Sequence, residues 1–374
     1  MKTSIHRAAT AALLAQVLFI PSARSARLRH DHVVRQVSVN STSVNVSSGE
    51  TLTLHVLVSR SAQLDVQVID RDGFVIRALP QKKNAAVGDH LIVWDGRDDA
   101  GEIVPDEAYS FRIVADSGVD DYFPAAREAG MVVIDPLSYS NVTATPTYVL
   151  KAPSRVHVQA GTVRTAAEGP VLKTIVDRQP RGAGKVAEHW SGLDESASIY
   201  VPGLPGFAIA IAATPLPENS VITFGNTKRS FLEYASHRRG RSLFQHRHPA
   251  AHHAGLDIFN DVAPALTLAP LRAVYHSNER FWSVTDSVLR LQLRADGPTA
   301  EAFVRQPGKI FVFVDSQLAA TRDAGRSADL FDVPLPEAGQ HVIAVNWRSD
   351  YGPVAVAVAR VRVERQTAQS ASRP

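Results

Sequence analysis

The chain has no cysteine among its 374 residues. That absence excludes disulfide bonds, thiolate metal sites, iron–sulfur clusters and a cysteine nucleophile. Net charge is also small, because 40 basic and 37 acidic residues leave a formal charge of +3. Basic and acidic residues are so evenly balanced that the overall charge gives no reason to expect nucleic acid binding. Hydrophobic residues make up 45% of the chain, so it can bury ordinary globular cores.

Long apolar runs are absent as well, and the sequence therefore predicts no membrane span in the mature chain. The longest run, Ala8 to Ile20, is shorter than the roughly 20 residues that cross a bilayer. It follows a basic start at Lys2 and Arg7 and precedes a stretch of small residues that ends at Ala26. This pattern is typical of a secretory signal peptide. We expect cleavage after Ser25 or Ala26 and a bacterial protein that is periplasmic or extracellular.

Apolar residues alternate with polar ones through most of the remaining chain, as in the segments 52–58, 64–68 and 109–113. A period of two is typical of strands with one buried face. Turn sequences such as Asp72-Gly73 and Ala100-Gly101 separate these short strands. The pattern predicts an all-β protein built of tandem Ig-like β-sandwich domains.

The chain also matches itself without gaps at an offset of 96 residues, which is the size of one small sandwich. The match predicts a domain duplication in which each copy places a Trp in its core and then forms a tight polar turn. In the first copy Asp95 and Asp98 are expected to accept hydrogen bonds from local backbone amides. The paired structural positions are Trp94 with Trp190, Gly96 with Gly192, and Asp98 with Asp194.

One block of the first copy resembles a known family. Its segments are 72–79 (DGFVIRAL), 93–101 (VWDGRDDAG) and 108–111 (AYSF). Over about 80 residues this block looks like the Ig-like module of the flagellar hook-capping protein family. The resemblance implies a β-sandwich used as a spacer or scaffold, with no catalytic residues to carry over. A signal peptide argues against the flagellar export route, which does not cleave one, so only the module is inferred.

These patterns divide the chain into a signal peptide and three sandwiches with a connector. A third sandwich is predicted from its own strand patterns, such as 309–315 and 339–347. The expected ranges are 1–26 for the signal peptide, 33–135 and 136–215 for the duplicated sandwiches, 216–270 for a His/Arg-rich connecting segment, 271–365 for the third sandwich and 366–374 for a disordered tail. Helical periodicity is scarce, and its best candidate is the segment 228–237.

Five of the 14 histidines lie between positions 237 and 253, inside the expected connector. Histidines 246 and 248 would face the same side of an extended segment, and Pro249 could open a short helix after them. Three imidazoles could then meet around Zn²⁺ or Cu²⁺. The candidate ligands are His246, His248, His252 and His253, although a His-rich stretch is also common in a solvated loop.

Arginines in the same stretch support a different interpretation. Together with protonatable histidines they could bind a carboxylate, a phosphate or an acidic polysaccharide, or contact a partner protein. Basic clusters are also often simply solvated. The candidate residues are Arg238, Arg239, Arg241 and Arg247.

Sequence motifs for catalysis are missing: there is no nucleophile elbow, phosphate-binding loop or zinc-protease helix motif. The sequence therefore favours a noncatalytic binding or scaffold protein of the bacterial envelope, without a required cofactor, that contacts an envelope protein or a surface polysaccharide. Two alternatives stay open. One is a periplasmic Zn- or Cu-binding protein that uses the histidine cluster, and the other is a noncatalytic carbohydrate-binding protein.

Overall fold

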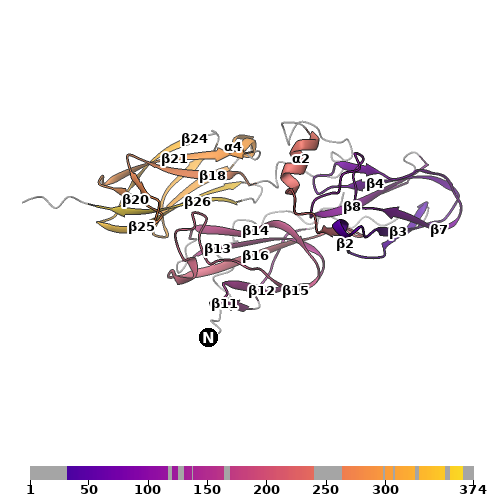
Figure 1. Cartoon of the computed structure of the whole chain (residues 1–374), viewed down its shortest axis with the longest axis horizontal. Helices are drawn as coiled ribbons and strands as arrows, with labels where there is room; N and C mark the ends of the chain where they lie inside the picture. The colour runs from indigo at the N-terminus through magenta and orange to yellow at the C-terminus, as the bar shows by residue number, and fades with distance from the viewer. Residues whose placement is uncertain are drawn as a thin grey trace, which may run out of the picture.

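The protein is an all-β chain of tandem Ig-like β-sandwiches, and this confirms the predicted fold class. The computed structural model describes residues 32–116, 120–124, 130–136, 138–163, 169–239, 263–297, 300–305, 308–324, 328–349 and 354–364. The expected signal peptide and tail lie outside these residues. Figure 1 shows three sandwiches, with the first at the right, the second below the centre and the third at the left.

Sandwich 1 contains the first copy of the repeat. Its alternating segments form strands because every second side chain enters one core, as in Leu52, Leu54, Val56 and Val58. One sheet has the order β1-β3-β7, and the other has the order β2-β17-β8-β4-β5, with β6 and β9 paired at β4 and β8. The strands from the first part of the chain are β1 (Val34–Val39), β2 (Ser43–Asn45), β3 (Leu52–Val58), β4 (Ala62–Ile69), β5 (Val75–Ala78), β6 (Lys82–Ala85), β7 (Gly88–Trp94), β8 (Ala108–Ala115) and β9 (Asp120–Tyr122), with a short 3-10 helix η1 (Val46–Ser48).

Sandwich 1 is completed by residues that come after sandwich 2. Strand β17 (Val221–Phe224) pairs in parallel with β2 and antiparallel with β8. Helix α2 (Phe231–Arg239) then places Phe231, Tyr234 and Ala235 in the core of sandwich 1. The segment 216–239, expected to be part of a connector, therefore contributes a strand and a helix to the first sandwich. Figure 1 shows α2 beside β4 and β8.

The start of helix α2 is fixed by a capping box. Ser230 Oγ accepts a hydrogen bond from the Glu233 amide at 3.3 Å, and Glu233 Oε2 accepts one from the Ser230 amide at 2.7 Å. These bonds to Ser230 lower the pKa of Glu233. The helix begins at Phe231, close to the expected helical segment 228–237.

Sandwich 2 packs a four-stranded sheet, β10-β16-β13-β14, against a three-stranded sheet, β11-β12-β15. Its core includes Tyr148 and the central residues of β13 and β16. The elements are β10 (Val132–Val133), β11 (Ser138–Ser140), β12 (Thr145–Leu150), β13 (Ser154–Thr162), β14 (Val171–Arg181), β15 (Gly184–Ala187), η4 (Val201–Gly203) and β16 (Phe207–Pro215).

Sandwich 3 packs the sheet β18-β21-β24 against the six-stranded sheet β19-β20-β26-β25-β22-β23. Trp347 and Phe303 lie in its core with ring centroids 6.0 Å apart. The elements are β18 (Ala265–Leu271), β19 (Val274–His276), β20 (Phe281–Val284), β21 (Val288–Asp296), α4 (Ala300–Arg305), β22 (Gly308–Val314), β23 (Gln317–Asp323), β24 (Ala328–Pro334), β25 (Gly339–Ser349) and β26 (Val354–Val363).

Strands β25 and β26 form a wall that two sandwiches share. Ala355, Ala357 and Ala359 belong to the core of sandwich 3, whereas Val354, Val356 and Val358 belong to the core of sandwich 2. Burial on both faces explains the uninterrupted apolar run at the start of β26, because neither face needs polar side chains. Sandwiches 2 and 3 are therefore joined by a continuous apolar interface.

A buried amide fixes the alignment of this interface. Asn346, which is fully buried, accepts a hydrogen bond from the Val171 amide and donates one to the Val171 carbonyl oxygen, each 2.8 Å long. The Asn346 side chain on β25 thus pairs with the main chain of β14 as a neighbouring strand would. A buried pair of this kind is costly to break, because both backbone groups would lose their partners.

A buried carboxylate joins sandwiches 1 and 2. Glu107, 1% exposed, lies between Arg71 of sandwich 1 at 3.3 Å and Arg155 of β13 in sandwich 2. Arg155 also donates to the Ala108 carbonyl oxygen at 3.3 Å. The negative charge of Glu107 is therefore paired with a cation from each sandwich, which offsets the cost of burying it.

Within the described residues, no helix is both long enough and apolar enough to cross a membrane.

We expect Asn346→Ala to lower the free energy of unfolding by about 2–4 kcal/mol, because it leaves the buried amide and carbonyl of Val171 without partners. Urea unfolding followed by tryptophan fluorescence measures the change. Thr321→Ala on the exposed strand β23 is the control, with an expected change within about 0.5 kcal/mol. An Asn346→Ala protein as stable as the control would show that the amide does not hold the interface.

Candidate functional site

The two copies of the repeat form the same turn. Trp94 Nε1 donates to the Arg97 carbonyl oxygen at 2.9 Å, and Trp190 Nε1 donates to the Leu193 carbonyl oxygen at 2.8 Å. Trp94 is buried in the core of sandwich 1, whereas Trp190 is partly buried against the core of sandwich 2. In both sandwiches the indole therefore closes the turn that follows it, by donating to the carbonyl oxygen three residues later.

Each turn is organised by the aspartate two residues after its glycine, Asp98 in the first copy and Asp194 in the second. Asp98 Oδ1 accepts from the amides of Ala100 and Glu102, and Asp194 Oδ1 accepts from the amides of Ser198 and Ile199. Asp95 also accepts from the Arg97 amide at 3.1 Å. These bonds are the local backbone contacts that the polar turn sequence predicts. The carboxylates stabilise the turns by accepting hydrogen bonds from backbone amides of the same turn.

The two carboxylates differ in what their second oxygen binds. Asp98 Oδ2 accepts from the Tyr234 hydroxyl at 2.9 Å and from Arg238 at 2.7 Å, both on helix α2. Burial would raise the pKa of Asp98, but the hydrogen bonds from Tyr234, Glu102 and Arg238 outweigh it and lower the pKa. Asp194 Oδ2 instead accepts from Ser196 of its own turn. Only the first copy uses the turn to hold α2.

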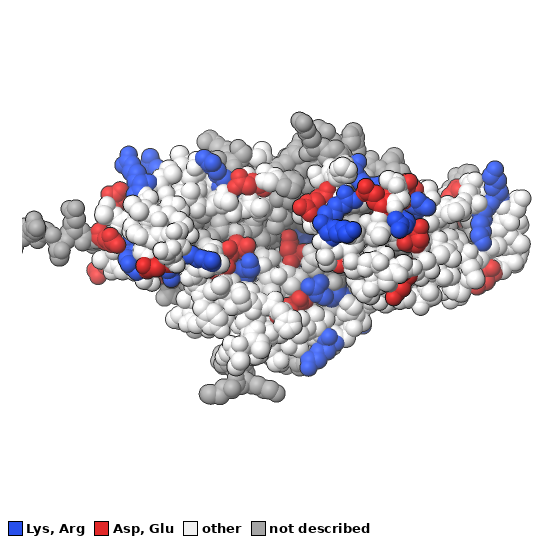
Figure 2. Space-filling view, in the orientation of Figure 1, with Lys and Arg blue, Asp and Glu red and all other residues white. Residues whose placement is uncertain are grey.

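Arg238, a candidate for binding anions, thus has an acidic partner within the chain. Charged side chains of both signs gather near α2 and the adjoining part of sandwich 1 in Figure 2. The side chain of Arg239 and all of Arg241 and Arg247 lie outside the described residues. The anion-binding interpretation of this cluster stays a prediction.

The candidate metal ligands His246, His248, His252 and His253 also lie outside the described residues, which end at position 239 and resume at 263. In the described part of the chain, no three His, Asp or Glu side chains are grouped as a metal ion would require. The metal interpretation therefore depends on the sequence pattern alone.

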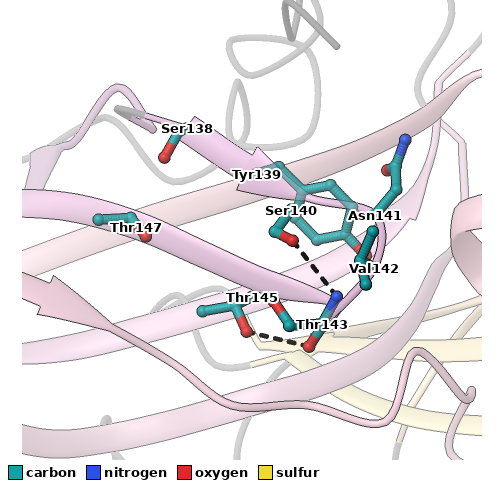
Figure 3. A pocket seen from close by; sticks show the side chains of 8 residues that line it. All are labelled: Ser138, Tyr139, Ser140, Asn141, Val142, Thr143, Thr145 and Thr147. Carbon is teal, nitrogen blue, oxygen red and sulfur yellow. Dashed lines mark hydrogen bonds between the residues drawn. The ribbon is translucent and has the colours of Figure 1, made fainter. Parts of the chain in front are cut away.

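A pocket of about 420 Å³ lies at the hairpin of β11 and β12 in sandwich 2. Figure 3 shows its lining, which is formed by eight neighbouring residues: Ser138, Tyr139, Ser140, Asn141, Val142, Thr143, Thr145 and Thr147. None of the eight carries a charge. The surface over β11 and β12 is likewise mostly uncharged in Figure 2. Such a lining can donate and accept hydrogen bonds, and it suits a neutral polar ligand.

Cross-strand pairing places four hydroxyls on one face of the hairpin. Ser138 pairs with Thr147 and Ser140 pairs with Thr145, so these four side chains share a face. The Thr143 amide donates to Ser140 Oγ at 3.3 Å, and Thr145 Oγ1 donates to the Thr143 carbonyl oxygen at 2.9 Å. This pocket was not among the sites predicted from the sequence, although the Ser and Thr residues at 138, 140, 143, 145 and 147 were a visible signal.

Tyr139 lies on the opposite face and packs against Phe207, with ring centroids 5.1 Å apart. Its hydroxyl is buried and has no hydrogen-bond partner among the described residues. Burial, with a further contribution from Tyr200, raises the pKa of Tyr139 well above its ordinary value. The phenol is therefore a protonated donor at neutral pH.

Comparison with known proteins finds one family model that matches part of the first sandwich. Residues 40–118 match the FlgD Ig-like domain. This confirms the hook-capping Ig-like module that the sequence predicted for the first copy. The matched range covers β2 to β8, but β17 and α2 lie outside it. No curated protein matches the chain.

Several solved structures resemble the chain weakly. Tandem repeats from the extending region of a large adhesion protein share 13% identity, with 88% of this chain and 73% of that one covered and a TM-score of 0.21. The fibronectin(III)-like modules of Clostridium thermocellum CbhA share 10% identity over 88% and 95% of the two chains, with a TM-score of 0.20. A Jonesia denitrificans lytic polysaccharide monooxygenase shares 18% identity over 26% and 77%, with a TM-score of 0.19. Similarities this low carry no inference about this chain.

We expect Asp98→Asn to release α2 and to lower the free energy of unfolding by about 1–3 kcal/mol at neutral pH, because Arg238 loses its anionic partner. Since the folded-state pKa of Asp98 is lowered, its stabilisation is complete above the ordinary value of 3.8 and is lost as the pH falls through the folded pKa. The difference from the wild type should therefore be constant near neutral pH and shrink in acid.

Hydrogen exchange of the α2 amides measures the release directly. Asp194→Asn is the matched control, because that carboxylate binds its own turn and should leave α2 protected. Protection of α2 unchanged by Asp98→Asn would contradict the assigned role of Asp98.

The histidine cluster predicts about one Zn²⁺ or Cu²⁺ per chain, bound by neutral imidazoles and lost in acid as they protonate. Elemental analysis after dialysis against either metal measures the stoichiometry. Replacing His246, His248, His252 and His253 with Ala should abolish it, while His341→Ala in sandwich 3 should not. A wild-type chain without stoichiometric metal would rule out the metal site.

Proposed function

We propose that the protein is an exported, noncatalytic scaffold of the bacterial cell envelope. It binds an envelope protein or a surface polymer through loops that its sandwiches hold in fixed positions. The observation that carries the proposal is the pair of buried joints, Glu107 between sandwiches 1 and 2 and Asn346 between sandwiches 2 and 3. A chain that only linked mobile parts would have no use for such joints.

Two further observations support the proposal. Residues 40–118 match the FlgD Ig-like domain, a resemblance that implies a β-sandwich used as a spacer or scaffold. The basic start, apolar run and small residues before position 27 have the form of a secretory signal peptide. Together they favour a spacer that acts outside the inner membrane.

The proposal predicts that the chain is exported and cleaved. Expression of the full-length gene should give a periplasmic or secreted product that begins at Ala26 or Arg27, because the small residues before the cut fit a signal peptidase. Mass spectrometry of cell fractions identifies the new N-terminus, and a variant lacking residues 1–26 should stay in the cytoplasm. An uncleaved full-length protein in the cytoplasm would contradict export.

The binding role is tested by sedimenting the purified mature chain with cell envelopes of its own species. Retention is expected. Protease treatment of the envelopes abolishes it if the partner is a protein, and periodate oxidation abolishes it if the partner is a glycan. A chain that stays in the supernatant with untreated envelopes would exclude the proposed role.

A further inference from the structure

The hydroxyl face of the β11–β12 hairpin includes side chains that the protein itself does not use. In the part of the chain that the structure describes, Ser138 and Thr147 form no side-chain hydrogen bond, although they face each other across the hairpin. Ser140 only accepts, from the Thr143 amide, so its proton can still be donated. Thr145 only donates, to the Thr143 carbonyl oxygen, so its lone pairs can still accept. This face therefore offers both donors and acceptors.

Tyr139 belongs to the lining of the same pocket. Its side chain is held against Phe207, and in Figure 3 the ring runs from β11 toward the Asn141–Val142 turn. Its hydroxyl is closed to solvent and has no hydrogen-bond partner among the described residues, which costs folding free energy. Tyr139 therefore supports the pocket from the core side, and a ligand does not reach its hydroxyl.

An exposed aromatic ring stands at the edge of the pocket. Tyr200, 47% exposed, donates a hydrogen bond to the Asn141 carbonyl oxygen at 3.1 Å. Its ring packs over Gly192, where a Cβ would collide with it and where φ is +81°. Tyr200 pairs with Leu193 as Ile103 pairs with Arg97 in the first copy. A partly buried aliphatic position has thus become an exposed tyrosine in the second copy.

We propose that this pocket binds a neutral saccharide unit of a surface glycan. The inference rests on the proposed function and specifies the polymer that the scaffold contacts. Sugar hydroxyls donate and accept in the same way as the Ser and Thr hydroxyls of the lining, and the C–H face of a sugar ring packs on an aromatic face such as that of Tyr200. The uncharged lining offers no ion pair to an anionic ligand, and the volume suits one or two sugar rings.

Titration calorimetry and amide NMR of the mature chain test the proposal. The neutral probes are chitohexaose, cellohexaose and maltohexaose, and polygalacturonate is the anionic probe. We expect one neutral probe to bind, with shifts at the β11–β12 hairpin and Tyr200. Thr147→Val removes one hydroxyl at nearly constant volume and should weaken binding by about five- to tenfold. Thr321→Val on exposed strand β23 should leave it unchanged.

Tyr139→Phe is a second control. Removing the buried, unpaired hydroxyl should raise the Tm of the free protein and leave the affinity for the neutral probe unchanged, because a ligand does not reach this group.

The proposal is overturned if none of the neutral probes binds, or if Thr147→Val binds as the wild type does. These outcomes are distinct from failure of the scaffold function. A chain that still sediments with envelopes but binds no neutral probe keeps the scaffold function and loses the saccharide site.

Discussion

The two hydrogen bonds between the Asn346 side chain and the Val171 main chain fix how the rest of the molecule is arranged. They lie inside an apolar interface in which the valines of β26 enter the core of sandwich 2. Apolar packing is non-directional, so on its own it would tolerate sliding. A buried amide that must satisfy both a donor and an acceptor selects one alignment. At the other joint, Glu107 does the same with a charge, since Arg71 and Arg155 come from different sandwiches.

The turn that follows Trp94 and the matching turn that follows Trp190 have the same backbone but bind different side chains. In sandwich 1 the spare oxygen of Asp98 binds Tyr234 and Arg238, and so attaches the helix that follows sandwich 2. In sandwich 2 the spare oxygen of Asp194 binds Ser196, and the neighbouring Tyr200 reaches toward the pocket. The backbone of the turn is conserved between copies because Gly96 and Gly192 both adopt positive φ. What each copy does depends on the side chains around it.

Much of the fold could be predicted from the sequence because it depends on local patterns. Alternation of apolar residues specified the strands, and the Trp-to-Asp turn specified the duplication and the FlgD Ig-like domain. The return of β17 to sandwich 1 could not be predicted, because a four-residue strand carries little pattern and its partners β2 and β8 lie more than 100 residues away. The same holds for Arg238, whose neutralisation by Asp98 depends on that return.

The candidate site was harder still. The Ser and Thr residues from 138 to 147 look like an ordinary polar hairpin until the register pairs them. The register also shows Tyr139 buried, with its hydroxyl unpaired as far as the described residues go. Likewise, the valines of β26 predicted a strand, but nothing in the strand itself indicated that they would face a second sandwich. Tertiary context determined both outcomes.

The fixed arrangement of the sandwiches can be measured by double electron–electron resonance between two spin labels. Because the chain has no cysteine, two introduced cysteines would be the only labelled positions. Val87→Cys in sandwich 1 and Leu318→Cys in sandwich 3 are suitable, since both positions are exposed. Because both buried joints lie between these labels, the account predicts a single narrow distance distribution. A broad or multiple distribution would show that the sandwiches move independently and would contradict it.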